Sequence, residues 1–194
     1  MTATAQERAE EISSGPPEAF GDEAALVRAA ASGNTGAFEE LVRSHHRRVY
    51  NFLYHMTRQH HDAEDLAQQT FIKAFHHLAR FDARRPLINW LLVIARNNAL
   101  NFFRSTRTWE EIPSDAASGT PSPAHLAEEK ERTANIWEKA RARLSQREFE
   151  VMWLRFAEER STEETAKIVG LTKIHVKVLV FRARQALLKG ESFP

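Results

Sequence analysis

The stretch that decides the predicted fold runs from Ser161 to Leu188 and reads STEETAKIVGLTKIHVKVLVFRARQALL. Ser161 stands three residues before Glu164, which is the spacing of the capping box that opens a helix. Gly170 can adopt the left-handed conformation that ends such a short helix, and Thr172 can cap a second, longer one. A short helix, a tight turn and a longer helix make a helix-turn-helix.

The second predicted helix has one apolar side and several basic residues outside it. The apolar residues recur at helical spacing and are Val176, Leu179, Val180, Ala183 and Leu187. The basic residues are Lys173, Lys177, Arg182 and Arg184. Because the second helix of a DNA-binding helix-turn-helix enters the major groove, the pattern favours DNA binding over the alternative of a plain packing unit.

Composition limits the class of protein. The 194 residues suffice for one or two domains, and the scarcity of glycine and proline, 7 each, suits a helical fold. The absence of cysteine excludes disulfides and thiolate metal sites. No apolar run is long enough to span a bilayer and no signal peptide opens the chain. We therefore expect a soluble protein of a reducing compartment, without membrane insertion.

The net charge of +1 hides a segregation of charge along the chain. Residues 72–107 carry a net +6 and residues 139–190 another +6, whereas residues 1–35 carry −4 and residues 108–131 carry −5. Two basic blocks separated by an acidic connector indicate two anion-binding modules, for which nucleic acid is the usual partner.

The sequence also divides into segments. Residues 1–20 are rich in Ala, Glu, Ser and Pro, which predicts a disordered tail. Helices are expected from about Asp22 to Ala30 and over residues 37–57, 62–79 and 87–106. Asp62 is expected to cap the helix over residues 62–79. Together these helices predict a small bundle in residues 21–107. Residues 108–123 predict a linker. A capping box at Ser145 and Glu148 supports a second helical domain over residues 124–190. The predicted fold is all-α, with two small helical domains, an N-terminal helix bundle and a C-terminal helix-turn-helix domain, joined by a flexible linker.

Two stretches of the N-terminal half carry polar residues in patterns that suit binding. In DAEDLAQQTF, residues 62–71, Asp65 and Gln68 are neighbours on the helix surface, although an ordinary solvated helix would show the same pattern. In INWLLVIARNNALNFFRSTR, residues 88–107, one stripe holds Trp90, Asn97, Asn101 and Arg104. Amides and guanidinium groups can hydrogen-bond base edges, and an aromatic ring can stack on an unpaired base. A polar solvent face with one stray tryptophan is the alternative.

Taken in order, these stretches resemble a known family. In chain order the stretches are DAEDLxQxTF, RFDxRRPxxxWLxxIARNxAL, a linker, LSxxEFEVxxLR and a helix-turn-helix ending in RARxxL. They are similar to the motifs of bacterial RNA polymerase sigma factors of the extracytoplasmic-function type, group IV of the sigma-70 family. The resemblance covers roughly Leu26 to Leu188. It implies a dissociable, non-catalytic, cytoplasmic subunit that binds core RNA polymerase at its clamp helices and flap, recognises promoter DNA, and is held by an anti-sigma factor.

The resemblance also implies roles for residues by position. For binding core polymerase, in residues 21–107, it nominates Asp62, Glu64, Asp65, Gln68 and Phe71. For reading and melting the promoter −10 element it nominates Arg80, Phe81, Asp82, Trp90, Arg96, Asn97, Asn101 and Arg104. For reading the −35 element, in residues 124–190, it nominates Thr172, Lys173, His175, Lys177, Arg182 and Arg184, with Thr162 at a helix start holding a phosphate.

The recognition helix departs from the family pattern. Where the family commonly shows TVKSRLxRAR, this chain has HVKVLVFRAR, so Val178 and Leu179 replace a Ser and an Arg. Gln69 also stands where the family usually has Glu. Ile174, Val178 and Phe181 form an apolar stripe on the side expected to face outward. The stripe could contact thymine methyl groups or be covered by a protein partner, and we favour the partner.

Neither metal binding nor catalysis is expected. The histidines cluster as His45-His46, His60-His61 and His76-His77, with His55 between two of these pairs. Adjacent histidines on a helix point about 100° apart, and neither i,i+4 spacing nor an HExxH arrangement is present. A nucleophile–base motif, a Walker loop and a dinucleotide-binding glycine pattern are also absent. We therefore expect no cofactor and no enzymatic activity.

Two other functions stay open at this stage. The chain could be a stand-alone helix-turn-helix DNA-binding regulator that dimerises and acts without polymerase, but such a regulator has no use for the DAEDLAQQTF helix. It could also be a protein-interaction module whose helix-turn-helix has lost contact with DNA. The apolar stripe of the recognition helix is the only support for that third function.

Overall fold

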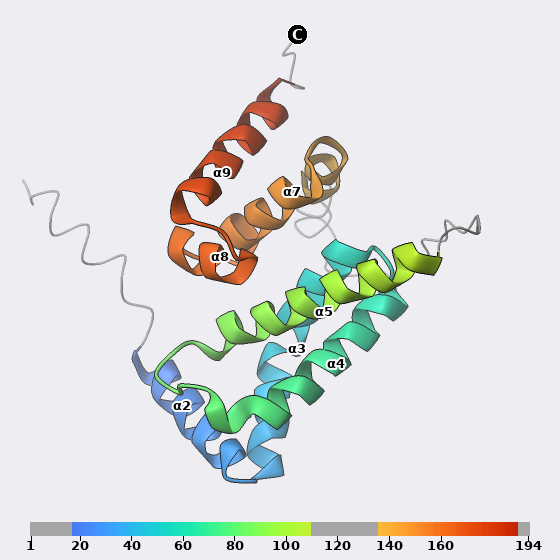
Figure 1. Ribbon diagram of the computed structural model, residues 1–194. Coiled ribbons are helices and arrows are strands. Elements are labelled where there is room, and N and C mark those ends of the chain that lie inside the picture. Colours follow the sequence, from blue (N-terminus) through green and yellow to red (C-terminus); the bar gives the residue numbers. More distant parts are fainter. Residues whose placement is uncertain (1–16, 110–135, 190–194) are drawn as a thin grey trace, which may run out of the picture.

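The computed structural model describes residues 17–109 and 136–189 (Figure 1). The first range, here called the N-terminal bundle, contains α2 (Pro17–Ala31), α3 (Thr35–Thr57), α4 (His60–His77), a 3-10 turn (Leu78–Arg80) and α5 (Leu87–Trp109). The second range, the C-terminal unit, contains a helical segment over residues 136–143, α7 (Gln146–Met152), a π-helical turn (Trp153–Ala157), α8 (Thr162–Val169) and α9 (Lys173–Leu188). These two ranges hold no strand, and the predicted all-α fold is confirmed.

The N-terminal bundle is built from apolar stripes that face one another. Its helices α3, α4 and α5 pack together, and α2 packs on α3. Val49, Phe52 and Leu53 of α3 are almost fully buried, as are Leu91 and Leu92 of α5. Each helix buries the side on which its apolar residues recur, because removing that side from water is the main driving force for packing.

Several helix boundaries differ from those predicted. α2 starts at Pro17 rather than near Asp22, which agrees with the preference of proline for the first turn. The prediction that Asp62 caps α4 is wrong, because the helix begins at His60 and Gln59 is its N-cap. The predicted linker over residues 108–123 begins two residues too early, because α5 extends to Trp109. The rest of that linker, the helical start near residue 124 and the predicted tail up to residue 16 lie outside the described residues.

The C-terminal unit contains the predicted helix-turn-helix in α8 and α9. Ser161 and Glu164 form the expected reciprocal capping box, and Gly170 ends α8 in the left-handed conformation with φ of 65°. The Thr172 hydroxyl accepts a hydrogen bond of 3.2 Å from the His175 backbone N–H and so caps α9. The second predicted capping box, at Ser145, opens α7. Local sequence signals therefore set the helix boundaries of this unit.

Loss of one cap should measurably weaken the C-terminal unit. Ser161→Ala removes the hydroxyl that accepts from the Glu164 N–H at 3.1 Å, which should cost about 1 kcal/mol of folding free energy. Thermal unfolding followed by circular dichroism should show a midpoint a few degrees lower. Ser44→Ala is the control, because the Ser44 hydroxyl lies in the middle of α3, is exposed and only donates to the Glu40 carbonyl. An equal shift in both variants would contradict the prediction.

The two units pack against each other. In Figure 1 the C-terminal unit lies above the N-terminal bundle, with α8 over α5, and α5 and α8 are in direct contact. This contact places helices about 75 residues apart in the chain side by side, as in the hydrogen bond from Asn89 to Glu164. The sequence analysis did not predict this contact between the units. The contact matters for the candidate site, because α5 carries several of the residues predicted to read the −10 element.

Candidate nucleic-acid interface

A groove runs between α3 and α4 in the N-terminal bundle. Its volume is about 690 Å³, and three of the predicted polymerase-binding residues line it, namely Glu64, Gln68 and Phe71. Ile72 and Phe75, also in the lining, expose large apolar surface. Apolar walls with a polar edge are suited to a partner helix.

The predicted polymerase-binding residues differ in exposure. Glu64 and Asp65 are exposed, with Glu64 3.2 Å from the His46 imidazole and Asp65 3.8 Å from that of His61. Gln68 is also exposed, and Asp62 is half-buried. Phe71 is buried in the core and its ring lies 6.0 Å from the ring of His46. The polar members of the set therefore face solvent, while Phe71 supports the groove from beneath.

A second cleft opens beside the loop before α5. The Phe81 and Trp90 rings stack there, with centroids 4.9 Å apart and an angle of 28° between the planes. The cleft has a volume of about 700 Å³ and is also lined by Arg80 and Asp82. It thus combines flat aromatic surface with basic groups, which is the combination that holds unpaired bases.

Asp82 organises the loop that forms this cleft. Its carboxylate accepts hydrogen bonds from the Arg84 backbone N–H at 3.1 Å and from Arg84 Nε at 2.9 Å. The side-chain bond from Arg84 is the main reason that the pKa of Asp82 is lowered. Arg85 Nε approaches the same carboxylate at 3.6 Å. The carboxylate thus holds two guanidinium groups of the loop, of which that of Arg85 lines the cleft.

The residues of α5 that were predicted to read the −10 element differ in exposure. Asn97, Asn101 and Arg104 are exposed, and Arg104 Nη1 donates to Asn101 Oδ1 at 3.3 Å. Arg96 differs from them, because it is only 7% exposed and its guanidinium pairs with the carboxylate of Glu150 from the C-terminal unit. In this arrangement Arg96 is therefore turned toward α7 and not toward solvent.

A buried polar network on α4 and α5 was missed by the sequence analysis. Asn98 is buried and donates from Nδ2 to Thr70 Oγ1 at 3.1 Å, while Lys73 Nζ donates to Asn98 Oδ1 at 2.5 Å. The Thr70 hydroxyl in turn donates to the Leu66 carbonyl at 2.7 Å. The network fixes α5 against the helix that forms the groove. Asn98 is one residue away from the exposed stripe on α5, and this position on the helix could have predicted the buried network.

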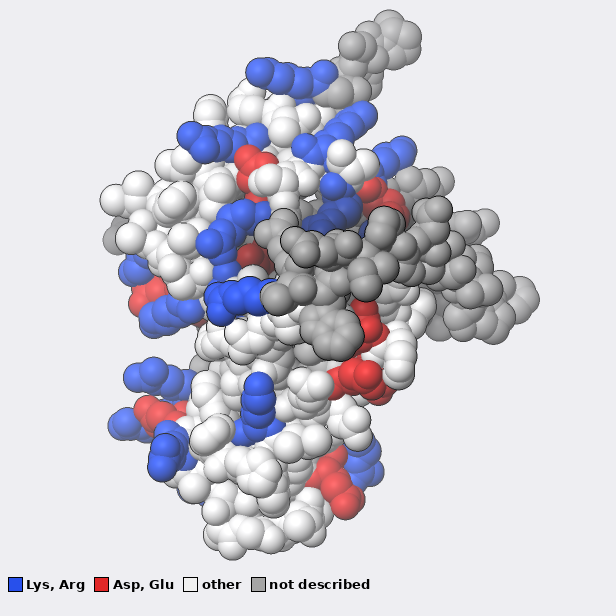
Figure 2. All heavy atoms as spheres, turned by 45° about the vertical axis from the view of Figure 1, so that its right-hand side comes forward, with Lys and Arg blue, Asp and Glu red and all other residues white. Residues whose placement is uncertain are grey.

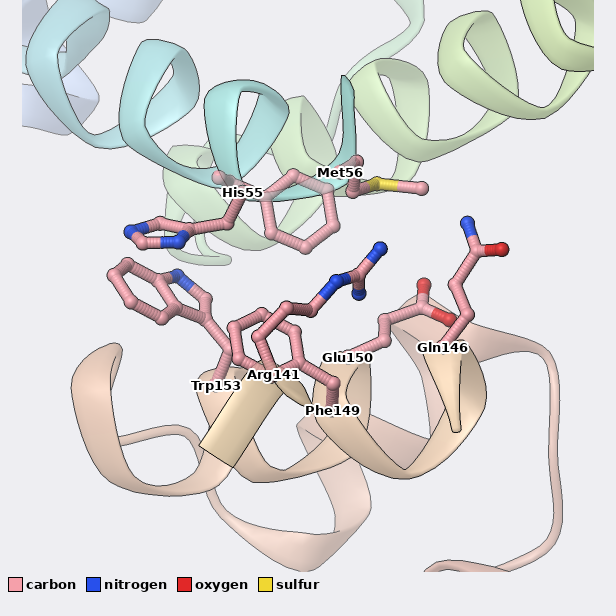
Figure 3. A pocket seen from close by; sticks show the side chains of 8 residues that line it. His55, Met56, Arg141, Gln146, Phe149, Glu150 and Trp153 are labelled. Carbon is pink, nitrogen blue, oxygen red and sulfur yellow. The ribbon is translucent and has the colours of Figure 1, made fainter. Parts of the chain in front are cut away.

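Charged and aromatic side chains also meet between the two units. Figure 3 shows His55 of α3 facing Trp153 of the C-terminal unit, and their ring centroids are 3.6 Å apart. Arg58 forms two hydrogen bonds of 2.6 and 2.7 Å with Glu138, and Arg48 contacts Glu158 at 2.7 Å. The contact between the units thus combines ion pairs with a pair of facing, tilted aromatic rings.

Burial at this contact shifts two pKa values. Burial raises the pKa of Glu150, and the nearby Arg96 and Arg147 offset only part of the effect. Burial, with the positive charges of Arg58 and Arg141, lowers the pKa of His55 to about 4, which Glu138 opposes. His55 is therefore neutral at physiological pH. The charge of the buried Glu150 carboxylate is only partly compensated by Arg96 and Arg147.

The contact between the units should weaken in mild acid. The pKa of His55 is about 4 when packed and 6.5 in the unperturbed side chain, so the separated form binds more protons between these values. The stabilisation from packing His55 is fully present above pH 6.5 and is lost as the pH falls toward 4. Between pH 7 and 5 the loss should be about 2 kcal/mol.

His55→Phe isolates this effect, because it keeps an aromatic ring against Trp153 and removes the titration. Thermal unfolding at pH 7 and pH 5 should show a larger fall in midpoint for the natural chain than for the variant. Arg58, Arg141 and Glu138, the charged groups that face His55, are unchanged in both proteins. Equal falls would show that His55 does not carry the pH dependence.

The residues predicted to read the −35 element lie on two flanks of α9. At 100° per residue, Lys173, Lys177 and Arg184 share one flank and His175 and Arg182 share the other. All five are exposed, as is the N-cap Thr172, whereas Thr162 at the start of α8 is half-buried. Lys173 Nζ pairs with Glu163 at 2.6 Å, and the Arg184 guanidinium lies 5.3 Å from the centre of the Phe156 ring.

The apolar stripe of α9 lies between these flanks, as predicted. Ile174 and Phe181 are 76% and 64% exposed, and Val178 is also exposed. Figure 2 shows several Lys and Arg on the upper part of the molecule, where Figure 1 places the C-terminal unit, and further Lys and Arg on the lower part. The face is therefore basic at its edges and apolar along its centre.

Two kinds of feature are absent from the described residues. Over residues 17–109 and 136–189, no three His, Cys, Asp or Glu side chains are grouped so as to hold a metal ion. Among the same residues, none of the helices has the length and apolar character to cross a membrane.

Comparison with known proteins gives the family. The family model for Sigma-70 region 2 matches residues 41–109, and that for Sigma-70 region 4 matches residues 135–187. The chain is 30% identical to the ECF RNA polymerase sigma factor SigM of Bacillus subtilis, over 77% of this chain and 91% of SigM. It is 31% identical to the ECF sigma factor BldN of Streptomyces coelicolor, over 84% of this chain and 64% of BldN.

Solved structures agree with this result. CnrH, solved in complex with the cytosolic domain of CnrY, is 25% identical and superposes with a TM-score of 0.64 over 87% of this chain and 96% of CnrH. The sigma factor RpoE of Bartonella quintana, solved with the anti-sigma factor NepR, has the same fold, with 24% identity and a TM-score of 0.65 over 78% of this chain and 94% of RpoE. The chain therefore belongs to the sigma-70 family and is a sigma factor of the extracytoplasmic-function type.

Proposed function

We propose that this sigma factor binds core RNA polymerase through the groove on α4 and reads promoter DNA with both of its units. The observation that carries the proposal is the arrangement of the N-terminal bundle, which presents the groove of Glu64 and Gln68 and the aromatic cleft of Phe81 and Trp90 on adjacent helices. The buried network of Asn98 fixes these helices to each other. A partner held in the groove is thereby placed close to DNA held at the cleft.

The proposed action is binding without catalysis. Trp90 and Phe81 would stack on bases extruded from the −10 element, and Asn97 and Asn101 would hydrogen-bond their edges. Unstacking a base costs a few kcal/mol, which these contacts and those to polymerase would offset. The basic flanks of α9 would hold the −35 duplex through its phosphates, with an affinity that falls steeply as salt rises.

Two further features belong to the proposal. An anti-sigma factor is proposed as a partner, because RpoE was solved with the anti-sigma factor NepR and CnrH with the cytosolic domain of CnrY. The exposed Ile174 and Phe181 of α9, between basic flanks, also support such a partner. The protein would act in the cytoplasm, since its proposed polymerase partner is there. The alternative of a stand-alone regulator is not favoured, because residues 41–109 match Sigma-70 region 2.

Reconstitution with core RNA polymerase tests the proposal directly. The purified chain is added to core enzyme, and transcripts from fragmented genomic DNA of the source organism are mapped. We expect defined start sites that core enzyme alone does not use and that disappear when the salt concentration is raised. Absence of any association with core enzyme, measured by co-elution, would overturn the proposal.

A further inference from the structure

The outward face of α9 is apolar where a recognition helix meets base edges. Ile174, Val178 and Phe181 are exposed, and at 100° per residue they lie within a sector about 60° wide. Lys177 and His175 lie outside this sector, so the first two turns present no polar side chain within it. The second helix of a DNA-binding helix-turn-helix turns this face into the major groove. The side chains placed to meet the bases are therefore apolar.

Basic side chains stand on both sides of this stripe. Lys177 and Arg184 lie on one flank, and His175 and Arg182 lie on the other, all exposed. α9 contains no acidic residue. A helix inserted in the major groove has a phosphate backbone on each side and base edges in front of it. The charge pattern of α9 matches this arrangement, because both flanks can approach phosphates while the stripe faces the bases.

The group that an apolar side chain can contact in the major groove is the 5-methyl group of thymine. The other three bases present only hydrogen-bonding groups along this edge, apart from ring C–H groups. An apolar stripe placed against those groups would remove them from water without giving them partners, which costs free energy. The stripe therefore favours thymine over the other bases.

The length of the stripe sets how many base pairs it can read. Ile174 and Phe181 are about two helical turns apart, which is a rise of about 10 Å along α9. Successive base pairs are about 3.4 Å apart, so the stripe spans about three of them. Leu188 is also exposed on this side, but it lies in the last turn, and recognition helices contact base edges with their N-terminal residues.

A protein partner is the competing occupant, and it was the favoured one from the sequence alone. A stable protein interface uses about 20 to 30 residues a side, so these three side chains would form a small part of it. By contrast, the stripe and its two flanks account for the whole base-facing and phosphate-facing surface of a recognition helix. An inhibitor that covers α9 would compete with DNA for the same face and is compatible with this assignment.

We propose that α9 reads the −35 element through its apolar stripe, and that Ile174, Val178 and Phe181 select thymine by contacting the 5-methyl groups of about three neighbouring base pairs. This inference rests on the proposed function, in which α9 holds the −35 duplex. The basic flanks supply affinity through phosphates whatever the sequence, whereas the stripe supplies the choice of bases.

Replacement of thymine by deoxyuridine tests the proposal, because it removes the 5-methyl group and keeps the hydrogen-bonding groups of the base. The template is a promoter fragment selected by the natural chain with core enzyme, with its −35 region randomised and selected again. We expect thymines at about three neighbouring base pairs. Deoxyuridine at these positions should lower the affinity of the holoenzyme about tenfold, since each buried methyl group contributes about fourfold. Deoxyuridine at thymines outside them is the control and should change nothing.

A variant that carries both Ile174→Ala and Phe181→Ala should lose the dependence on the methyl groups. Both side chains are exposed, so the variant should fold, which circular dichroism checks. Its affinities for the thymine and deoxyuridine templates should differ by less than about twofold. Leu188→Ala is the matched control, because Leu188 is an exposed apolar residue of the same helix beyond the proposed contact. It should keep the full difference between the two templates.

Equal binding of the natural holoenzyme to both templates would overturn the inference and assign the stripe to a protein partner. A double variant that keeps the tenfold difference would overturn it as well. If the natural chain does not bind core enzyme, the proposed function is wrong, and the two templates are built instead from duplexes that the full chain selects by itself. A methyl effect there would still support the inference, whereas its absence, or the absence of any selected sequence, would overturn it.

Discussion

Replacing Asp65 and Gln68 together by alanine is expected to lower the affinity of the protein for core RNA polymerase by about 100-fold. Both side chains are exposed on α4 beside the groove, and the nearest charged partner of Asp65 is His61 at 3.8 Å. Their removal therefore leaves no buried group unpaired, and folding should be unaffected. A hundredfold loss corresponds to about 2.7 kcal/mol, which is reasonable for two central contacts of a helix-in-groove interface.

The measurement is titration of labelled core enzyme with each purified variant. His77→Ala is the control, because His77 is exposed at the end of α4 and lies outside the lining of the groove. Binding of the double variant to duplex DNA carrying the −35 element should be unchanged, since α9 is untouched. Full affinity for core enzyme in the double variant would place the polymerase contact elsewhere on the molecule.

Trp90→Ala is expected to reduce promoter opening by about 10- to 100-fold while leaving polymerase binding intact. Stacking of one base on an aromatic ring contributes about 1–3 kcal/mol, and Trp90 presents the larger ring of the stacked pair in the cleft. Removing the indole also leaves Phe81 without its partner. The loss should appear as fewer unpaired thymines that react with permanganate in the holoenzyme–promoter complex.

Trp90→Phe is the matched variant, because it keeps an aromatic surface against Phe81 and should recover part of the opening. Co-elution with core enzyme should be the same for the natural chain and both variants. An alanine variant that opens the promoter as well as the natural chain would show that Trp90 is only a packing residue of the loop.

These two predictions concern surfaces that differ in accessibility. The groove of Gln68 is open to solvent, whereas the cleft of Trp90 faces α8.

Much of the fold was accessible from the sequence because it depends on neighbours along the chain. Caps at Ser145, Ser161 and Thr172 and the left-handed Gly170 form from residues within four positions of each other. The 3.6-residue period likewise placed Val176 and Ala183 inside and Ile174 and Phe181 outside. Where competing local signals were present, as at Asp62, the boundary was misplaced, because His60 and His61 could extend the helix backwards.

The helices, their buried faces and the resemblance that named the candidate residues could all be read from the sequence, since each depends on spacing along one chain. Three contacts could be seen only in the folded chain: Arg96 pairs with Glu150, His55 faces Trp153, and α8 lines the cleft of Phe81 and Trp90. The physical reason is that contacts between units depend on how two finished surfaces fit. Residues 54 or more positions apart carry no periodic signal of such a fit.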